Sequence, residues 1–414
     1  MAKRRTARYW LQQIHLWTGL VLCLPLVLMG ITGSILVYAH DIEHLFGQGE
    51  PRVTTVGEWR SPDELVAAAV AASSEPGRVP IAVRWPAEIG DPAAVRLSRP
   101  GMASERPAAR TGGSQQGAGT VPAVSPFAGS LQILLDPVSL QVLETQQAMT
   151  GWVRFFHDLH GRLLIPGGTG REIVGWLGIA MLVLGCSGLV IWWPRQGQWK
   201  SAFTIRRGAK GLRLHRDLHG AVGIWTLLIF MLVNFTGVYL AFPQQTGAAI
   251  NAIFPGRDMR AAMFQARVEP VPGATPVGLR EAVDLARQSV PDARFLNAFL
   301  PTRPNQAIRI GMVRGDHEDG APVVTVLIDP WRGRVMDVFD PKTMSAGEAI
   351  IAWQRALHYG TGLGGLYKFL VFVSGVIIPL FAVTGVFMWW IKRRNRRNTE
   401  LAKEAALRQA AGAG

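Results

Sequence analysis

The sequence has few charged residues and almost no cysteine. Charged side chains make up 17% of its 414 residues, and two cysteines cannot form a disulfide framework or a four-cysteine metal site. The formal net charge of +14 would suggest a nucleic-acid partner, but basic nucleic-acid binders are rich in charge and this chain is poor in it. With 49% hydrophobic residues, the chain is also too apolar for a disordered or collagen-like protein. The combination of few charged residues and many hydrophobic ones indicates a membrane protein.

Four runs with little or no charge are long enough to cross a bilayer, which takes about 20 residues. They cover residues 16–38, 173–193, 221–242 and 366–391. The first run is too long for the core of a signal peptide and lacks a small-residue cleavage pattern, so we expect it to be retained as a helix. Pro25 is expected to kink this run, and Pro379 the fourth.

Basic residues are concentrated in three segments next to these runs. Residues 1–15, 194–220 and 392–414 hold 18 of the 43 basic residues and three acidic ones, whereas the rest of the chain has a net charge of −1. Short loops rich in Lys and Arg stay in the cytoplasm. We therefore expect a multi-pass protein with both termini cytoplasmic, the long segments outside, lipid around its helices and no nucleic-acid partner.

The two halves of the chain carry the same motifs in the same order. The repeated motifs are H-x3-G at 15–19 and 219–223, and W-x-R-x-x-H at 152–157 and 353–358. In each half an apolar strand ending in Asp-Pro precedes the second motif. Such matches indicate an internal duplication whose halves share one orientation in the membrane.

The predicted fold is a mainly α membrane protein with four transmembrane helices in two tandem repeats. Each repeat is expected to carry one α+β domain outside the membrane, at residues 39–172 and 243–365. The segment 101–130 is rich in Gly, Ala, Ser and Pro, and we predict a flexible insertion there.

Eight of the nine histidines fall near ends of the predicted helices, and no Asp or Glu lies inside any of the four runs. That absence disfavours a zinc or di-iron carboxylate site. Neutral imidazoles in an apolar bundle suit haem iron with two axial histidines. The duplication pairs His15 with His219 on the cytoplasmic side, and a second pair outside includes His358. A histidine at a helix end can equally cap carbonyls or reach the headgroup layer.

Two residues compete as the partner of His358. The W-x-R-x-x-H alignment matches His157 to it, whereas the Leu-His context favours His160. The motifs leave both open.

Other residues near the histidines are candidates for supporting parts. His215, one turn before His219, is a candidate second ligand or propionate contact, and Arg154 and Arg355 are candidates for binding haem propionates or an anionic substrate. Small residues near the ligands are expected to leave room for a porphyrin: Gly19 and Gly223, one turn from His15 and His219, and Gly161 beside His160.

Five motifs in order resemble the PepSY-associated transmembrane family. They are IHLWTGL at 14–20, LHGRLL at 159–164, SGLVIWWPR at 187–195, DLHGxxG at 217–223 and LHYGTG at 357–362. The resemblance implies a bacterial inner-membrane protein with two periplasmic PepSY-like domains. It further implies two haem b groups held by His15, His160, His219 and His358, and an activity like that of the ferric-siderophore reductases in this family. Those proteins reduce a periplasmic Fe(III)-siderophore and release Fe(II).

Some relatives carry a C-terminal flavin- and nicotinamide-binding domain, but no Gly-rich dinucleotide motif occurs in this sequence. We therefore expect electrons to come from quinol or from a cytoplasmic reductase. No catalytic side chain is predicted, because one-electron transfer needs no protein acid or base. The alternative is a non-enzymatic PepSY-domain membrane protein that binds or regulates a periplasmic peptidase or another partner.

Overall fold

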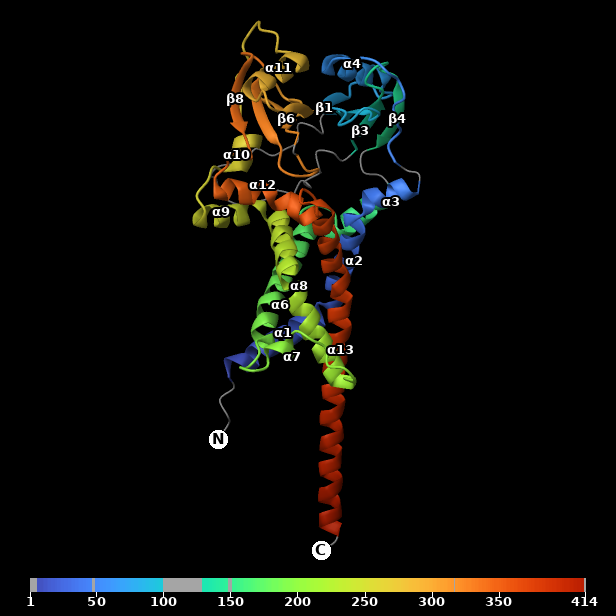
Figure 1. Cartoon of the computed structure of the whole chain (residues 1–414), viewed down its shortest axis with the longest axis vertical. Coiled ribbons are helices and arrows are strands. Elements are labelled where there is room, and N and C mark those ends of the chain that lie inside the picture. The colour runs from blue at the N-terminus through green and yellow to red at the C-terminus, as the bar shows by residue number, and fades with distance from the viewer. Residues whose placement is uncertain (1–5, 47–48, 100–128, 148–150, 316, 413–414) are drawn as a thin grey trace, which may run out of the picture.

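The computed structural model describes residues 6–46, 49–99, 129–147, 151–315 and 317–412. Three levels follow one another along its long axis (Figure 1). A head of β1–β8 with α4 and α11 lies at the top, and a middle layer of α3, α5, α9, α10 and α12 lies beneath it. Below them is a bundle of the long helices α1, α2, α6, α8 and α13.

Three helices of the bundle are long and apolar enough to cross a membrane. They are α6 (Thr169–Trp192), α8 (Gly211–Ala241) and α13 (Gly364–Gly412). Helix α2 packs along α13. Their backbones meet so closely that a Cβ on Gly30 would lie 2.6 Å from the carbonyl oxygen of Gly375. Glycines at such crossings let membrane helices approach. The short helix α7 (Trp199–Ala202) lies between α6 and α8.

The first predicted span is two helices rather than one. Helices α1 (Ala7–Val21) and α2 (Cys23–Val37) meet at Leu22 with a bend of 67°, so the described residues contain three candidate spans, or four if the bent pair is one span. Pro25 lies in the first turn of α2 and has no N–H to donate to the carbonyl of Val21. The bend thus falls where a proline interrupts the helical hydrogen bonds. Pro379, by contrast, lies inside the single helix α13.

The head contains one eight-stranded antiparallel sheet in the order β4-β3-β2-β1-β5-β6-β7-β8. One α+β domain was expected in each half, and the strands of the two halves join in a seam between β1 and β5. The seam pairs Ala82–Arg84 with Asn297–Phe299, and Leu300 N donates to Ile81 O at 3.0 Å beside it. The strands are β1 (Val79–Arg84), β2 (Ala93–Ser98), β3 (Leu131–Leu135), β4 (Val142–Gln147), β5 (Arg294–Phe299), β6 (Ile308–Val313), β7 (Val324–Asp329) and β8 (Arg334–Phe339).

Helices α4 (Pro62–Ala72) and α11 (Leu279–Ser289) pack on this sheet over one shared apolar core. Ser61 and Glu64 form a capping box that starts α4. The carboxylate of Asp63 on α4 accepts hydrogen bonds from the first N–H groups of α11, at 2.8 Å from Leu279 N and 2.7 Å from Arg280 N. The two halves are therefore linked by the seam, by the core and by a helix cap.

The middle layer consists of short helices that join the head to the bundle. They are α3 (Ala39–Leu45), α5 (Gly151–Arg162), α9 (Pro243–Ile253), α10 (Met259–Phe264) and α12 (Ala346–Tyr359). Ser345 and Glu348 form a capping box at the start of α12, and Gly360 ends it in the left-handed conformation, at φ 75°. Helices α5 and α12 each carry one of the predicted upper histidines.

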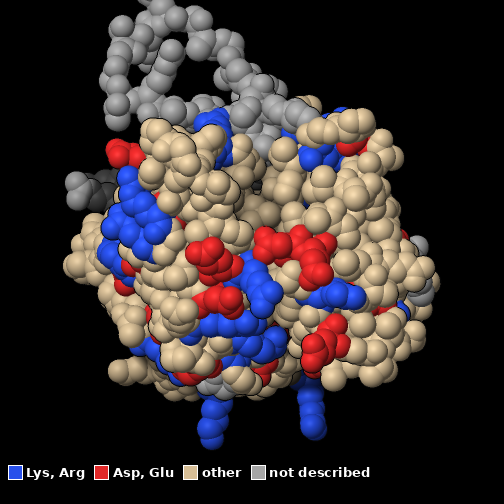
Figure 2. Space-filling model, turned by 90° about the horizontal axis from the view of Figure 1, so that it is seen from above, with Lys and Arg blue, Asp and Glu red and all other residues tan. Residues whose placement is uncertain are grey.

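The charged residues of the head are of both signs. Figure 2 shows Lys and Arg intermixed with Asp and Glu on the face seen from above. The predicted insertion at 101–130 lies outside the described residues except for its last two positions. The basic segment that follows residue 391 continues α13 as a helix up to Gly412.

Candidate functional site

Two histidines face each other in the lower part of the bundle. Helix α1 carries His15 and helix α8 carries His219, and the centres of their rings lie 6.1 Å apart with planes at 74°. We call them the lower pair.

A hydroxyl group holds each ring of the lower pair. His15 Nδ1 lies 2.9 Å from Ser187 Oγ on α6, and His219 Nδ1 lies 2.8 Å from Thr384 Oγ1 on α13. Ser187 donates its one proton to Val183 O at 2.6 Å, and Thr384 donates its proton to Leu380 O at 2.7 Å.

A hydroxyl that has already donated its proton can only accept. Nδ1 must therefore carry the hydrogen in both rings of the lower pair, and both Nε2 atoms keep a free lone pair.

A second pair lies between the middle layer and the bundle. Helix α5 carries His160 and helix α12 carries His358, and their ring centres are also 6.1 Å apart, with planes at 40°. The structure thus brings His160 next to His358, while His157 lies one turn earlier on α5. We call His160 and His358 the upper pair.

Backbone carbonyls determine which nitrogen is protonated in the upper pair. His160 Nδ1 lies 3.1 Å from Met29 O, and His358 Nδ1 lies 3.0 Å from Val233 O. A carbonyl oxygen can only accept, so Nδ1 donates in both rings. Thr32 Oγ1 and Thr236 Oγ1 add further contacts to the same nitrogens, at 3.1 Å and 3.2 Å. As in the lower pair, both Nε2 atoms are left unprotonated.

The upper pair is neutral at physiological pH. Loss of hydration, with a smaller contribution from His358, lowers the pKa of His160 to about 3. Burial likewise lowers the pKa of His358. A neutral imidazole is the form that binds a metal ion.

Glycines let helices approach the rings closely. A Cβ on Gly33 would lie 2.9 Å from Cε1 of His160, and one on Gly237 would lie 3.0 Å from Cε1 of His358. Around Gly19, Gly223 and Gly161 there is more space. A Cβ on Gly19 or Gly223 would meet its nearest neighbour only at 3.8 Å and 3.9 Å, and one on Gly161 would meet nothing within 4 Å.

Both pairs have the dimensions of axial haem ligation. Two imidazoles on opposite sides of one metal ion, each bound at about 2 Å, have ring centres about 6 Å apart. Among the described residues there is no group of three or more His, Cys, Asp or Glu side chains that could hold a metal ion. Two imidazoles at this separation could serve as two ligands of one metal ion. A hydrogen bond that orients the ring through its other nitrogen is typical of histidine metal ligands.

The sequence of residues 12–392 matches the family model described as the PepSY-associated TM region. The chain belongs to this family. It is also 26% identical over 254 residues to a protein of Pseudomonas aeruginosa described as "Uncharacterized protein PA4219". The match covers 57% of this chain and 62% of that protein, so the chain spans about three fifths of the relative's length.

The supporting candidates have other partners in this PepSY-associated protein. The ring of His215 stacks on Phe387 at 5.0 Å, with planes at 3°. Arg154 lies 3.5 Å from the carboxylate of Asp158, and the guanidinium of Arg355 lies 5.2 Å from the ring centre of Tyr359.

The four hydroxyl residues that contact the histidines were not singled out from the sequence as site residues. Thr32 and Thr236 stand at the same offset of 204 as His15 and His219, and this offset is the signal that could have identified these two threonines. Ser and Thr inside an apolar run ordinarily hydrogen-bond to their own helix, so their second role is visible only in three dimensions.

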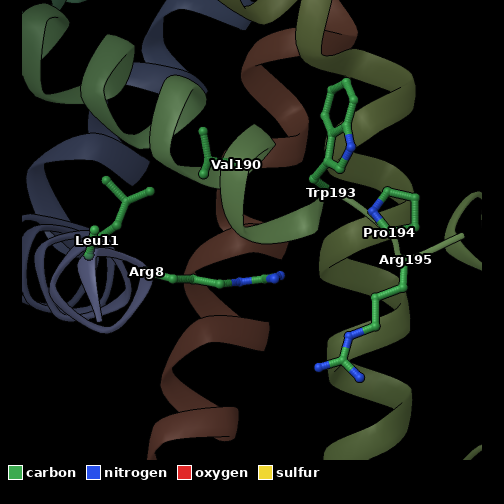
Figure 3. Close-up of a pocket in the computed structure, with 7 residues that line it drawn as sticks. Arg8, Leu11, Val190, Trp193, Pro194 and Arg195 are labelled. Carbon is green, nitrogen blue, oxygen red and sulfur yellow. The ribbon is translucent and has the colours of Figure 1, made fainter. Parts of the chain in front are cut away.

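A hollow of about 460 Å³ opens at the lower end of this PepSY-associated protein, between α1 and the end of α6 (Figure 3). Arg8 borders it and donates to Ile191 O at 2.8 Å. The lining combines two guanidinium groups with an apolar wall. The lining residues are Ala7, Arg8, Leu11, Val190, Trp193, Pro194 and Arg195.

Proposed function

We propose that the protein is a b-type di-haem oxidoreductase of the bacterial inner membrane. It would pass electrons across the membrane to a periplasmic Fe(III)-siderophore and release Fe(II). The observation that carries this proposal is the matched hydrogen bonding of four histidines, which engages Nδ1 of every ring and leaves two Nε2 atoms in each of two layers, where the ring centres are 6.1 Å apart.

The lower pair, His15 and His219, would hold one haem, and the upper pair, His160 and His358, the other. When bound, haem b supplies a one-electron carrier in each layer. The chain's own residues orient the four rings, keep them neutral and hold them in an apolar bundle. The equivalent contacts within the upper layer also support two tandem repeats, because Thr32 and Thr236, which stand at a fixed offset of 204, each contact one histidine of the upper pair.

The proposed orientation puts the termini in the cytoplasm and the head in the periplasm. It rests on the basic residues that flank the lower end of the bundle and on the mixed charge of the head. Electrons would then enter from quinol or a cytoplasmic reductase and leave on the side of the upper pair. One electron converts Fe(III) into Fe(II), which oxygen chelators bind far more weakly, so reduction alone achieves release.

The first experiment measures haem in the purified full-length protein. We expect a reduced-minus-oxidised absorption spectrum of b-type haem and two haems per chain. His15→Ala or His219→Ala should remove one of them, and His160→Ala or His358→Ala the other. His317→Ala, in a loop of the head, is the matched control and should keep both. A colourless protein from haem-replete cells would overturn the proposal and favour the non-enzymatic alternative.

The second experiment measures reduction. Protein reduced by dithionite and then freed of excess reductant should transfer electrons to a ferric siderophore, and a colorimetric Fe(II) chelator should report the product. His160→Ala should release less Fe(II) than the His317→Ala control. Equal release from both variants would contradict a role of the upper pair in the reaction.

A further inference from the structure

A third pair of histidines lies apart from the two layers. Helix α3 carries His40 and His44, which are four residues apart and therefore on one face of the helix. Both are exposed. Figure 1 shows α3 on the flank of the molecule, below the half of the head that contains β3 and β4.

The two rings bring their Nε2 atoms together. These nitrogens are 3.1 Å apart, while the ring centres are 4.4 Å apart and the planes are at 86°. If the nitrogens pointed straight at each other, as in a well-aligned N–H···N hydrogen bond, the ring centres would be more than about 5 Å apart. The shorter separation means that at least one ring is turned away from the line between the nitrogens, and both nitrogens are within reach of one ion placed beside them.

We propose that His40 and His44 form a binding site for a divalent transition-metal ion. An ion bound at about 2 Å from each nitrogen would make an angle of about 100° between them, which lies between square and tetrahedral geometry. Imidazole suits copper(II), nickel(II), zinc(II) and iron(II), and affinities for the first three should exceed that for iron(II). With two protein ligands, the remaining positions are open to water or to a chelator that carries the metal.

The surroundings favour a fixed site over two mobile side chains. Asp41, between the two histidines in sequence, is held by an ion pair with Lys368 of α13. This contact ties α3 to the bundle. On the other side, the chain at Gly49 passes so close to Nδ1 of His44 that a Cβ there would collide with the ring. The Nε2 atom of His44 is therefore the one turned toward His40.

The test uses the full chain in detergent and copper(II) as the probe. Electron paramagnetic resonance should show one copper(II) per chain with two coordinated nitrogens, and titration calorimetry with nickel(II) should give the affinity. His40→Ala or His44→Ala should weaken nickel(II) binding by about 10- to 100-fold and abolish the two-nitrogen signal. His317→Ala is the control and should bind as the wild type does.

Unchanged affinity in both His40→Ala and His44→Ala would overturn the proposal, and so would a two-nitrogen signal that persists in either variant. The circular dichroism spectrum of each variant shows whether the protein is folded, and His44→Gln provides a second variant if His44→Ala fails that check. Because the histidines of the lower and upper pairs stay intact, the site can fail this test while the di-haem proposal holds, and the reverse.

Discussion

At the residue scale, the site depends on where single protons go. Ser187 and Thr384 donate their protons to carbonyls of their own helices, so they can only accept from His15 and His219. A hydroxyl one helix away from a ligand thus decides which imidazole nitrogen is free. Without the histidines, the hydroxyls of Ser187 and Thr384 would only hydrogen-bond to carbonyls of their own helices.

Ser187→Ala tests this arrangement directly. The substitution removes the acceptor of His15, and we expect haem affinity at the lower pair to fall by about 10- to 100-fold while the upper haem stays bound. Haem per chain after extended washing is the measurement. Ser187→Thr keeps an acceptor and should retain both haems. If Ser187→Ala also retains both haems, the hydroxyl does not position His15.

An ion-pair cluster in the head makes a pH-dependent contribution to stability. Arg314 donates two hydrogen bonds to Asp340, at 3.0 Å and 2.8 Å, and one to Asp292 at 2.6 Å. The hydrogen bonds from Arg314 lower the pKa of Asp340 below its ordinary value of 3.8. Because the folded state binds fewer protons here, the contribution is complete above pH 3.8 and is lost as the pH falls through the lowered pKa.

Arg314→Gln should therefore reduce the free energy of unfolding of the head by about 1.5–3 kcal/mol at pH 7. The difference from the wild type should shrink as the pH is lowered below 3.8, where the wild type loses the same contribution. Tm values of both proteins between pH 3 and 7 check this. Arg287→Gln, which removes an exposed pair with Asp284, should change stability by less than about 0.5 kcal/mol. A gap between Arg314→Gln and wild type that is constant with pH would contradict the assignment.

At the element scale, the bend at Leu22 serves both layers. Helix α1 carries His15 of the lower pair, while α2 carries Thr32 and Gly33, which contact His160 of the upper pair. In a straight helix, His15 and Thr32 would lie along a single helix axis. The 67° bend lets one chain segment contribute to two sites on differently directed helices.

Pro25→Ala restores the N–H that could bond to Val21 O, and we expect it to straighten the α1–α2 segment. Spin labels at Ile14 and Ile31, in a background without Cys23 and Cys186, should then move apart toward about 26 Å, the length of 17 residues of straight helix. The lower haem should be lost before the upper one.

Pro243→Ala is the control for this substitution. Pro243 is the first residue of α9, where no intrahelical N–H is needed, so the distance between the labels should not change. An unchanged distance in Pro25→Ala as well would mean that packing of α1 against α6, and not the proline, maintains the bend.

The four apolar runs and the strands ending in Asp-Pro could be predicted, because hydropathy and turn residues act locally. The bend at Leu22 could be anticipated only as a kink, since its angle depends on how α1 packs against α6. The seam between β1 and β5 could not be predicted, because its partners Val83 and Ala298 are far apart in sequence. For the site, the motifs left His157 and His160 open, since both lie on α5 and only the position of α12 distinguishes them.

At the scale of the whole molecule, the distribution of basic residues predicts which end faces the cytoplasm. In a background without Cys23 and Cys186, Ser289→Cys at the end of α11 should react with a membrane-impermeant maleimide in intact cells. Thr204→Cys, in the segment between α6 and α8, should react only after the cells are permeabilised. The opposite pattern would invert the proposed orientation.

The seam has a consequence for how the protein is made. Strand β1 is synthesised about 200 residues before β5, and the chain between them contains α6 and α8. If these helices cross the membrane, the first half of the head reaches its compartment with an unpaired strand edge and must wait for the second half. Pro80 and Arg84, at either end of β1, are residue types that discourage such an edge from pairing with a foreign strand. Biogenesis would then be ordered by translation, and the head would close only after α8 has been inserted.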